Sequence, residues 1–132
     1  MNLVDSSGWI EYFSRGPNAD SFTEPILDTS QLVVPTIVLY EVFKLIVRER
    51  GESSGLLAVA SMREGIIVEI NEEQALNGAK LSLDHRLPMA DALILACAHA
   101  KKATLWTQDD HFKELSSVRY IPKSEQPYPE PD

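Results

Sequence analysis

Short apolar runs rich in β-branched residues alternate along this chain with longer segments of helical periodicity. Leu32–Val34 precedes a helical pattern over Thr36–Glu49, and Ile66–Ile70 precedes another over Glu72–His85. Apolar residues at helical spacing mark a helix that buries one face, and short apolar runs mark buried strands. Strands that alternate with helices form parallel sheets covered by helices. The sequence therefore predicts an α/β fold, a three-layer α/β/α sandwich with a mainly parallel central sheet.

The remaining segments complete this pattern. Further strands are expected over Met1–Asp5, Ala103–Thr107 and Val118–Ile121, and further helices over Gly8–Ser14, Asp20–Asp28, Pro88–Lys101, Asp110–Leu115 and from Ser53 or Ser54 to Met62. Ser6 or Ser7 is expected to cap the helix Gly8–Ser14, and Asn71 is expected to cap the helix Glu72–His85. The length of 132 residues favours a single domain, expected over residues 1–123. Residues 124–132 are proline-rich and acidic, and are expected to form a flexible tail.

The composition favours a reducing, aqueous compartment. Cys97 is the single cysteine, so no disulfide can form within the chain. The first residues show no basic segment followed by an apolar one, so no signal peptide is expected. No apolar stretch approaches the roughly 20 residues that span a bilayer. We therefore expect a cytoplasmic protein that does not associate with membranes.

The net charge of −8 argues at first against a nucleic-acid partner, because phosphates repel an acidic surface. Four acids in unusual positions and three acids in the tail account for seven of these eight charges. The rest of the chain is nearly neutral, and bound divalent cations would offset the four acids. The acidity therefore weakens the case for a nucleic-acid partner only slightly.

Two of the four unusual acids follow predicted strands. Asp5 closes the strand Met1–Asp5, and Asp109 follows the strand Ala103–Thr107. In open α/β sheets, ligands bind beyond the carboxyl ends of the strands. Both side chains are therefore expected at the edge of the sheet where a ligand would lie.

The other two acids lie within apolar helices. Glu41 is surrounded by apolar residues in Thr36–Glu49, and Asp91 lies in Pro88–Lys101, which is apolar on nearly every side. Burying a lone carboxylate costs several kcal/mol unless it is paired. Asp91 has no basic residue three or four positions away, whereas Lys44 follows Glu41 at i+3 and offers it an ion pair.

Each acid also has a purely structural interpretation. Asp5 can serve as a turn or cap residue, and Asp109 as the cap of a short helix. Asp91 can favour the positive end of its helix, and Glu41 can lie on a partly exposed face. Four such coincidences are less plausible than one shared divalent-cation site. Oxygen ligands select Mg²⁺ or Mn²⁺, and the sequence contains no Cys/His spacing typical of zinc.

Four segments carry these acids in a fixed order and spacing. They are Asp5-Ser6-Ser7, Glu41 in its helix, Leu87-Pro88-Met89-Ala90-Asp91-Ala92, and Thr107-Gln108-Asp109-Asp110-His111-Phe112. In this order, over Met1 to Ile121, the chain resembles the PIN-domain ribonucleases, and within them the VapC-type toxins of toxin–antitoxin pairs.

The resemblance implies a Mg²⁺-dependent endoribonuclease, with Mn²⁺ as an alternative ion, that forms a homodimer and is inhibited by a small antitoxin protein. The family's catalytic and metal-binding acids correspond to Asp5, Glu41, Asp91 and Asp109. Ser6 and Thr107 fall on hydroxyl positions that support the site. A bound Mg²⁺ would neutralise phosphate oxygens and activate a water for attack on the RNA phosphodiester.

Basic residues near the acids are candidates for holding RNA. Lys44 and Arg48 continue the Glu41 face at i+3 and i+7, so they are placed either to contact phosphates or to form a solvated helix face. The three histidines are scattered along the sequence, and surface or capping positions are expected for them. They are His85, His99 and His111.

Three other functions are alternatives to the nuclease. A phosphatase with Asp5 as nucleophile usually needs a second acid two residues later, where this chain has Ser7. A receiver-type phosphoacceptor domain needs paired acids at the end of the first strand. A catalytically inactive PIN-fold module that binds protein partners remains the alternative, although such a module need not keep all four acids.

Overall fold

The computed structural model describes residues 1–124. Within them the strands are β1 (Asn2–Val4), β2 (Leu32–Pro35), β3 (Ile66–Val68), β4 (Thr104–Thr107) and β5 (Val118–Tyr120). The α-helices are α1 (Ser6–Phe13), α2 (Thr23–Leu27), α3 (Thr36–Arg50), α4 (Glu52–Met62), α5 (Glu72–His85) and α6 (Met89–Ala100). Short 3₁₀ turns are η1 (Ala19–Phe22), η2 (Thr29–Gln31) and η3 (Asp110–Phe112). Apart from Ser124, the expected tail 124–132 lies outside the described residues.

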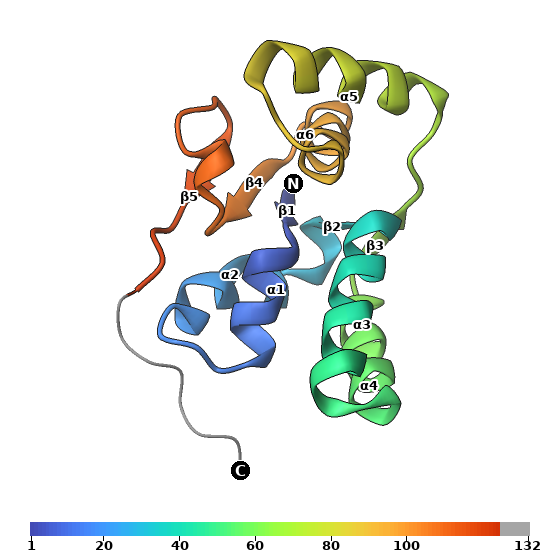
Figure 1. Ribbon diagram of the computed structural model, residues 1–132. Coiled ribbons are helices and arrows are strands. Elements are labelled where there is room, and N and C mark those ends of the chain that lie inside the picture. The colour runs from blue at the N-terminus through green and yellow to red at the C-terminus, as the bar shows by residue number, and fades with distance from the viewer. Residues whose placement is uncertain (125–132) are drawn as a thin grey trace.

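The strands form one sheet in the order β3-β2-β1-β4-β5, and every neighbouring pair is parallel (Figure 1). The predicted three-layer α/β/α sandwich is confirmed, and the sheet is parallel throughout residues 1–124. From β1 the chain builds outward through β2 and β3, then returns to the other side of β1 for β4 and β5. The strand order therefore reverses between β1 and β4, which is where open α/β sheets bind their ligands.

The sheet is covered by helices, so its central strands are buried on both faces. Leu3, Val33 and Leu105 have no exposed surface, as expected for parallel strands that read as apolar runs. Helix α5 packs on α6, and α3 packs on α4 (Figure 1). None of the helices in residues 1–124 combines the length and hydrophobicity that a bilayer-spanning helix requires.

Several element ends differ from expectation for local physical reasons. Asp5, rather than Ser6 or Ser7, caps α1, because its carboxylate accepts the Gly8 N–H at 3.1 Å. Strand β3 stops at Val68, since its partner in β2 is Pro35, the last residue of that strand. The structure also begins α4 at Glu52, before the two serines.

Candidate metal centre

Asp5 is a buried carboxylate at the carboxyl end of β1, with only 3% of its surface exposed. Its Oδ1 accepts hydrogen bonds from the Gly8 N–H at 3.1 Å and the Ser7 hydroxyl at 2.7 Å. Its Oδ2 accepts one from the Thr107 hydroxyl at 2.6 Å. Within residues 1–124, two lone pairs on Oδ1 and one on Oδ2 are therefore engaged, which leaves one lone pair on Oδ2 for a further ligand.

Burial dominates the electrostatics of this carboxylate. It raises the pKa of Asp5 from 3.8 to about 6, although the hydrogen bonds from Thr107, Ser7 and Gly8 act in the opposite direction. The negative charge of Asp109 adds to the increase. A carboxyl group this poorly solvated gains from a nearby cation.

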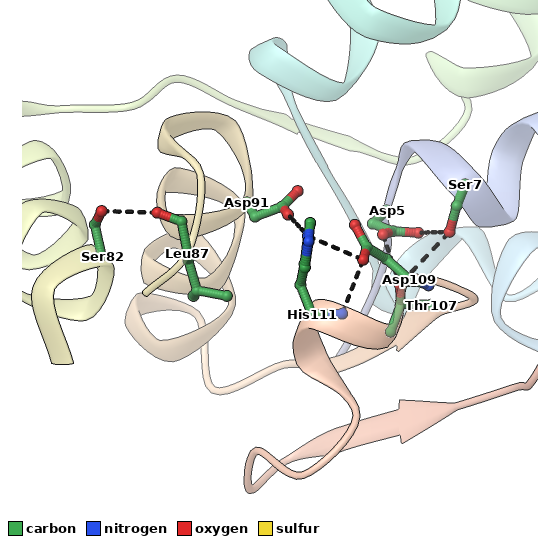
Figure 2. A network of polar contacts seen from close by, with 8 residues as sticks. All are labelled: Asp5, Ser7, Ser82, Leu87, Asp91, Thr107, Asp109 and His111. Carbon is green, nitrogen blue, oxygen red and sulfur yellow. Dashed lines mark hydrogen bonds and ion pairs between the residues drawn. The ribbon is translucent and has the colours of Figure 1, made fainter. Parts of the chain in front are cut away.

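Thr107 connects β4 to the same site. While its hydroxyl donates to Asp5, it accepts the Asp109 N–H at 2.9 Å. The Asp109 carboxylate caps the turn η3 and accepts the His111 N–H at 2.9 Å. Figure 2 shows this chain of contacts, which holds the acids at the ends of β1 and β4 in one network. The Ser7 hydroxyl strengthens it by accepting the N–H of Gln108 at 3.0 Å.

Asp91 enters the site from the first turn of α6, and its partner is a histidine on another element. The Nδ1 atom of His111 lies 2.9 Å from Asp91 Oδ2 and 3.2 Å from Asp109 Oδ1 (Figure 2). Burial, together with the charge of Asp109, raises the pKa of Asp91, and the hydrogen bond from His111 opposes this. The hydrogen bond to Asp91 is the main cause of a raised pKa at His111.

Asp91, Asp109 and His111 each offer one ligand atom, and these atoms lie within 4.8 Å of one another. Asp5 and Glu41 do not belong to this tightest group, although the Thr107 hydroxyl joins Asp5 to the backbone of Asp109. Carboxylate oxygens suit Mg²⁺ and Mn²⁺, and imidazole nitrogen suits transition metals. The donor set therefore fits a divalent cation.

Glu41 is linked to the site through the residue next to Asp5. Its Oε1 accepts a hydrogen bond from the Ser6 hydroxyl at 2.5 Å, so α3 and the start of α1 are tied together. Within residues 1–124, Glu41 does not form the ion pair with Lys44 that the sequence allows. The Lys44 ammonium instead lies 3.5 Å from the Tyr40 hydroxyl and 5.6 Å from its ring centre.

A groove of about 220 Å³ runs beside Glu41 along α3. Tyr40, Glu41, Lys44 and Arg48 line it together with Leu45. Arg48 pairs with its neighbour Glu49 at 3.2 Å, and both of these side chains are more than half exposed. The groove thus presents two cations and an exposed aromatic ring next to an acid of the site.

The sequence interpretation missed two contributors. The sequence predicts a role for Ser7 only as a helix cap, whereas its hydroxyl donates a hydrogen bond to Asp5. His111 was expected at a surface or cap; its side chain is half exposed, but its ring faces two of the acids. The sequence signal for both was adjacency, because Ser7 lies two residues from Asp5 and His111 lies two residues from Asp109.

Comparison with known proteins gives both a family and a set of similar folds. The model of the PIN domain family matches residues 3–118. No curated protein matches the sequence. A toxin–antitoxin complex from Klebsiella pneumoniae contains a chain with 23% identity and a TM-score of 0.76, and the match covers 92% of this chain and 100% of that one.

Two further solved structures share the fold. The Mycobacterium tuberculosis toxin VapC20, described as cleaving the sarcin–ricin loop, has 15% identity and a TM-score of 0.74, covering 88% of this chain and 95% of that one. The Rickettsia felis VapBC2 complex, bound to a promoter DNA fragment, has 14% identity and a TM-score of 0.71, covering 92% and 97%. Since the family model matches most of its length, this chain belongs to the PIN domain family.

Proposed function

We propose that this protein is a divalent-cation-dependent endoribonuclease, the toxin of a toxin–antitoxin pair. The observation that carries the proposal is the convergence of Asp5, Asp91 and Asp109, from three separate elements, at the switch point of the sheet. Clustered carboxylates repel one another and cost stability, so a cation that binds them accounts for their arrangement. RNA as substrate follows from the resemblance to PIN-domain ribonucleases.

The chain's own residues divide the work of holding the ion and the substrate. Asp91 and Asp109 would bind the cation directly, and Asp5 would use the remaining lone pair of Oδ2. Thr107 and Ser7 keep Asp5 fixed, and supporting partners of this kind maintain metal affinity. When bound, the cation supplies charge neutralisation at the scissile phosphate and a lower pKa for an attacking water.

Glu41 and the groove beside it would hold the RNA strand and the attacking water. Ser6 fixes one oxygen of Glu41, and the second oxygen would accept a proton or bind the ion through water. Lys44 and Arg48 are placed to contact phosphates in the groove. Tyr40, which is 62% exposed, offers a face on which an unpaired base can stack.

The proposal includes protein partners. A groove of about 220 Å³ between α1, α3 and α4 is lined mainly by the apolar residues Phe13, Ile46, Leu57 and Ala58, together with Arg50 and Ser54. A segment of a small antitoxin with apolar and acidic side chains would fit there. Exposed Leu76, Leu83 and Met89 on α5 and α6 offer a surface for the homodimer. Action on cellular RNA would place the protein in the cytoplasm.

The proposal is tested by incubating the purified protein with varied RNAs in Mg²⁺, in Mn²⁺ and in EDTA. Cleavage is expected only with a divalent cation, and Asp91→Asn is expected to reduce its rate at least about a hundredfold, because a direct ligand matters at least as much as its supporting partners. Asp84→Asn, an exposed acid on α5, is the matched control and should cleave normally.

The outcomes distinguish the proposal from the binding-module alternative. Undiminished cleavage by both Asp5→Asn and Asp91→Asn would show that the chemistry lies elsewhere. No cleavage of any RNA by the unaltered protein would favour a module that only binds partners. In cells, expression should arrest growth, and Asp5→Asn should relieve that arrest.

A further inference from the structure

His111 brings an imidazole nitrogen atom to the candidate metal centre. Its Nδ1 lies 2.9 Å from Asp91 and 3.2 Å from Asp109. Within residues 1–124 neither acid forms an ion pair with a lysine or arginine. Among the described residues, the imidazole of His111 is therefore the basic side chain that contacts these two carboxylates.

A backbone hydrogen bond helps to fix the position of the His111 ring. Asp109 caps the turn η3 and accepts the His111 N–H at 2.9 Å, which fixes where the side chain leaves the main chain. Asp91 belongs to the first turn of the buried helix α6. Figure 2 shows the ring between the two carboxylates, one from each element.

The distances from His111 Nδ1 to the two carboxylate oxygens are typical of hydrogen bonds. They are also typical of the distances between neighbouring ligands of one ion. Two ligands about 2.1 Å from a small cation, at right angles to one another, are about 3.0 Å apart. The distances from Nδ1 to the two carboxylate oxygens lie on either side of that value. All three ligand atoms fall within 4.8 Å of one another, close to the separation of about 4.2 Å between opposite ligands of such an ion.

We propose that His111 Nδ1 is a direct ligand of the cation, together with Asp91 and Asp109, and that the site consequently prefers Mn²⁺ to Mg²⁺. This inference rests on the proposed function, because it assigns a further ligand to the same centre. Mg²⁺ takes oxygen ligands almost exclusively, whereas imidazole binds first-row transition metals well. A mixed nitrogen and oxygen set therefore shifts the preference of a site that the sequence alone describes as oxygen-only.

The test measures binding and not activity. Mn²⁺ and Mg²⁺ affinities are determined by isothermal titration calorimetry for the full chain and for His111→Asn, with His85→Asn on α5 as the control. Asparagine places an oxygen near the position of Nδ1, so the variant keeps a neutral ligand and changes only its element. We expect His111→Asn to weaken Mn²⁺ binding about tenfold or more and to change Mg²⁺ binding much less.

A spectroscopic measurement gives an independent answer. Electron spin-echo modulation of the Mn²⁺-bound protein should show coupling to a histidine nitrogen, and His111→Asn should remove it. Coupling that is absent from the unaltered protein, or Mn²⁺ affinity that is equal or higher in His111→Asn, would overturn the inference. Thermal denaturation of each variant shows whether it folds.

Failure of this inference is distinguishable from failure of the proposed function. If Asp91→Asn abolishes Mn²⁺ binding but no nitrogen coupling is found, the metal centre stands and His111 is only a counter-ion. If the unaltered protein binds neither ion at millimolar concentration, the proposed function itself fails.

Discussion

Replacing Asp5 with asparagine is predicted to stabilise the metal-free protein at neutral pH. The Asp5 carboxyl is almost fully buried, and burial raises its pKa from 3.8 to about 6. Between pH 3.8 and about pH 6, the Asp5 carboxyl is protonated in the native protein but ionised in the unfolded chain. The free energy of unfolding therefore decreases as the pH rises from 3.8 to about 6. Above about pH 6 the stabilising contribution of the Asp5 proton is lost.

The magnitude follows from the same pKa values. Each pKa unit corresponds to about 1.4 kcal/mol, so ionising Asp5 in the native state costs about 3 kcal/mol. Asparagine does not ionise, but its amide nitrogen replaces an oxygen that accepts the Thr107 hydroxyl, a change worth about 1 kcal/mol. The free energy of unfolding of Asp5→Asn should thus exceed that of the unaltered protein by about 2 kcal/mol at pH 7.5 and fall below it by about 0.5 kcal/mol at pH 4.

Urea denaturation in EDTA at pH values from 4 to 7.5 measures this difference, with tryptophan fluorescence as the signal. Trp9 is fully buried and reports on the core. Asp84→Asn, which changes an exposed acid, should stay within about 0.5 kcal/mol of the unaltered protein at every pH. A difference for Asp5→Asn that does not vary with pH, or lower stability at pH 7.5, would refute the reasoning.

Two further substitutions test how the site is held. Thr107→Val removes the hydroxyl that donates to Asp5 and accepts from Asp109, so urea denaturation should show a loss of about 1–3 kcal/mol, and carboxyl NMR a further rise in the pKa of Asp5. Gly8→Ala would place a methyl group 2.6 Å from a Val4 methyl and 2.7 Å from the Phe22 ring. It should cost about 1–3 kcal/mol by overpacking, and a melting temperature equal to that of the unaltered protein would contradict this contact.

The sequence predicts the fold well because the periodicities of strand and helix are local properties. The alternation of apolar runs and helical patterns predicts a parallel sheet. Asp5 and Asp109 follow β1 and β4, so both are expected at the same edge of that sheet. Asp91 could be singled out because an acid in an apolar helix without a local partner needs an explanation from elsewhere in the fold.

The contacts that the sequence could not predict join distant parts of the chain. The hydrogen bond from Thr107 to Asp5 spans 102 residues, and His111 meets Asp91 across 20. No spacing rule specifies such pairs, since they depend on how α6 and the turn after β4 pack together. Glu41 likewise accepts a hydrogen bond from Ser6, 35 residues away, whereas Lys44, which the sequence offers as its partner, lies against Tyr40.

The central claim is that these acids gather around one divalent cation. Its most direct test is a crystal of the protein soaked in Mn²⁺, with diffraction data collected at the manganese absorption edge. The account predicts an anomalous peak within bonding distance of the Asp91 and Asp109 carboxylates, and its loss in Asp91→Asn. A protein that cleaves RNA with Mn²⁺ but shows no peak at these residues would contradict it.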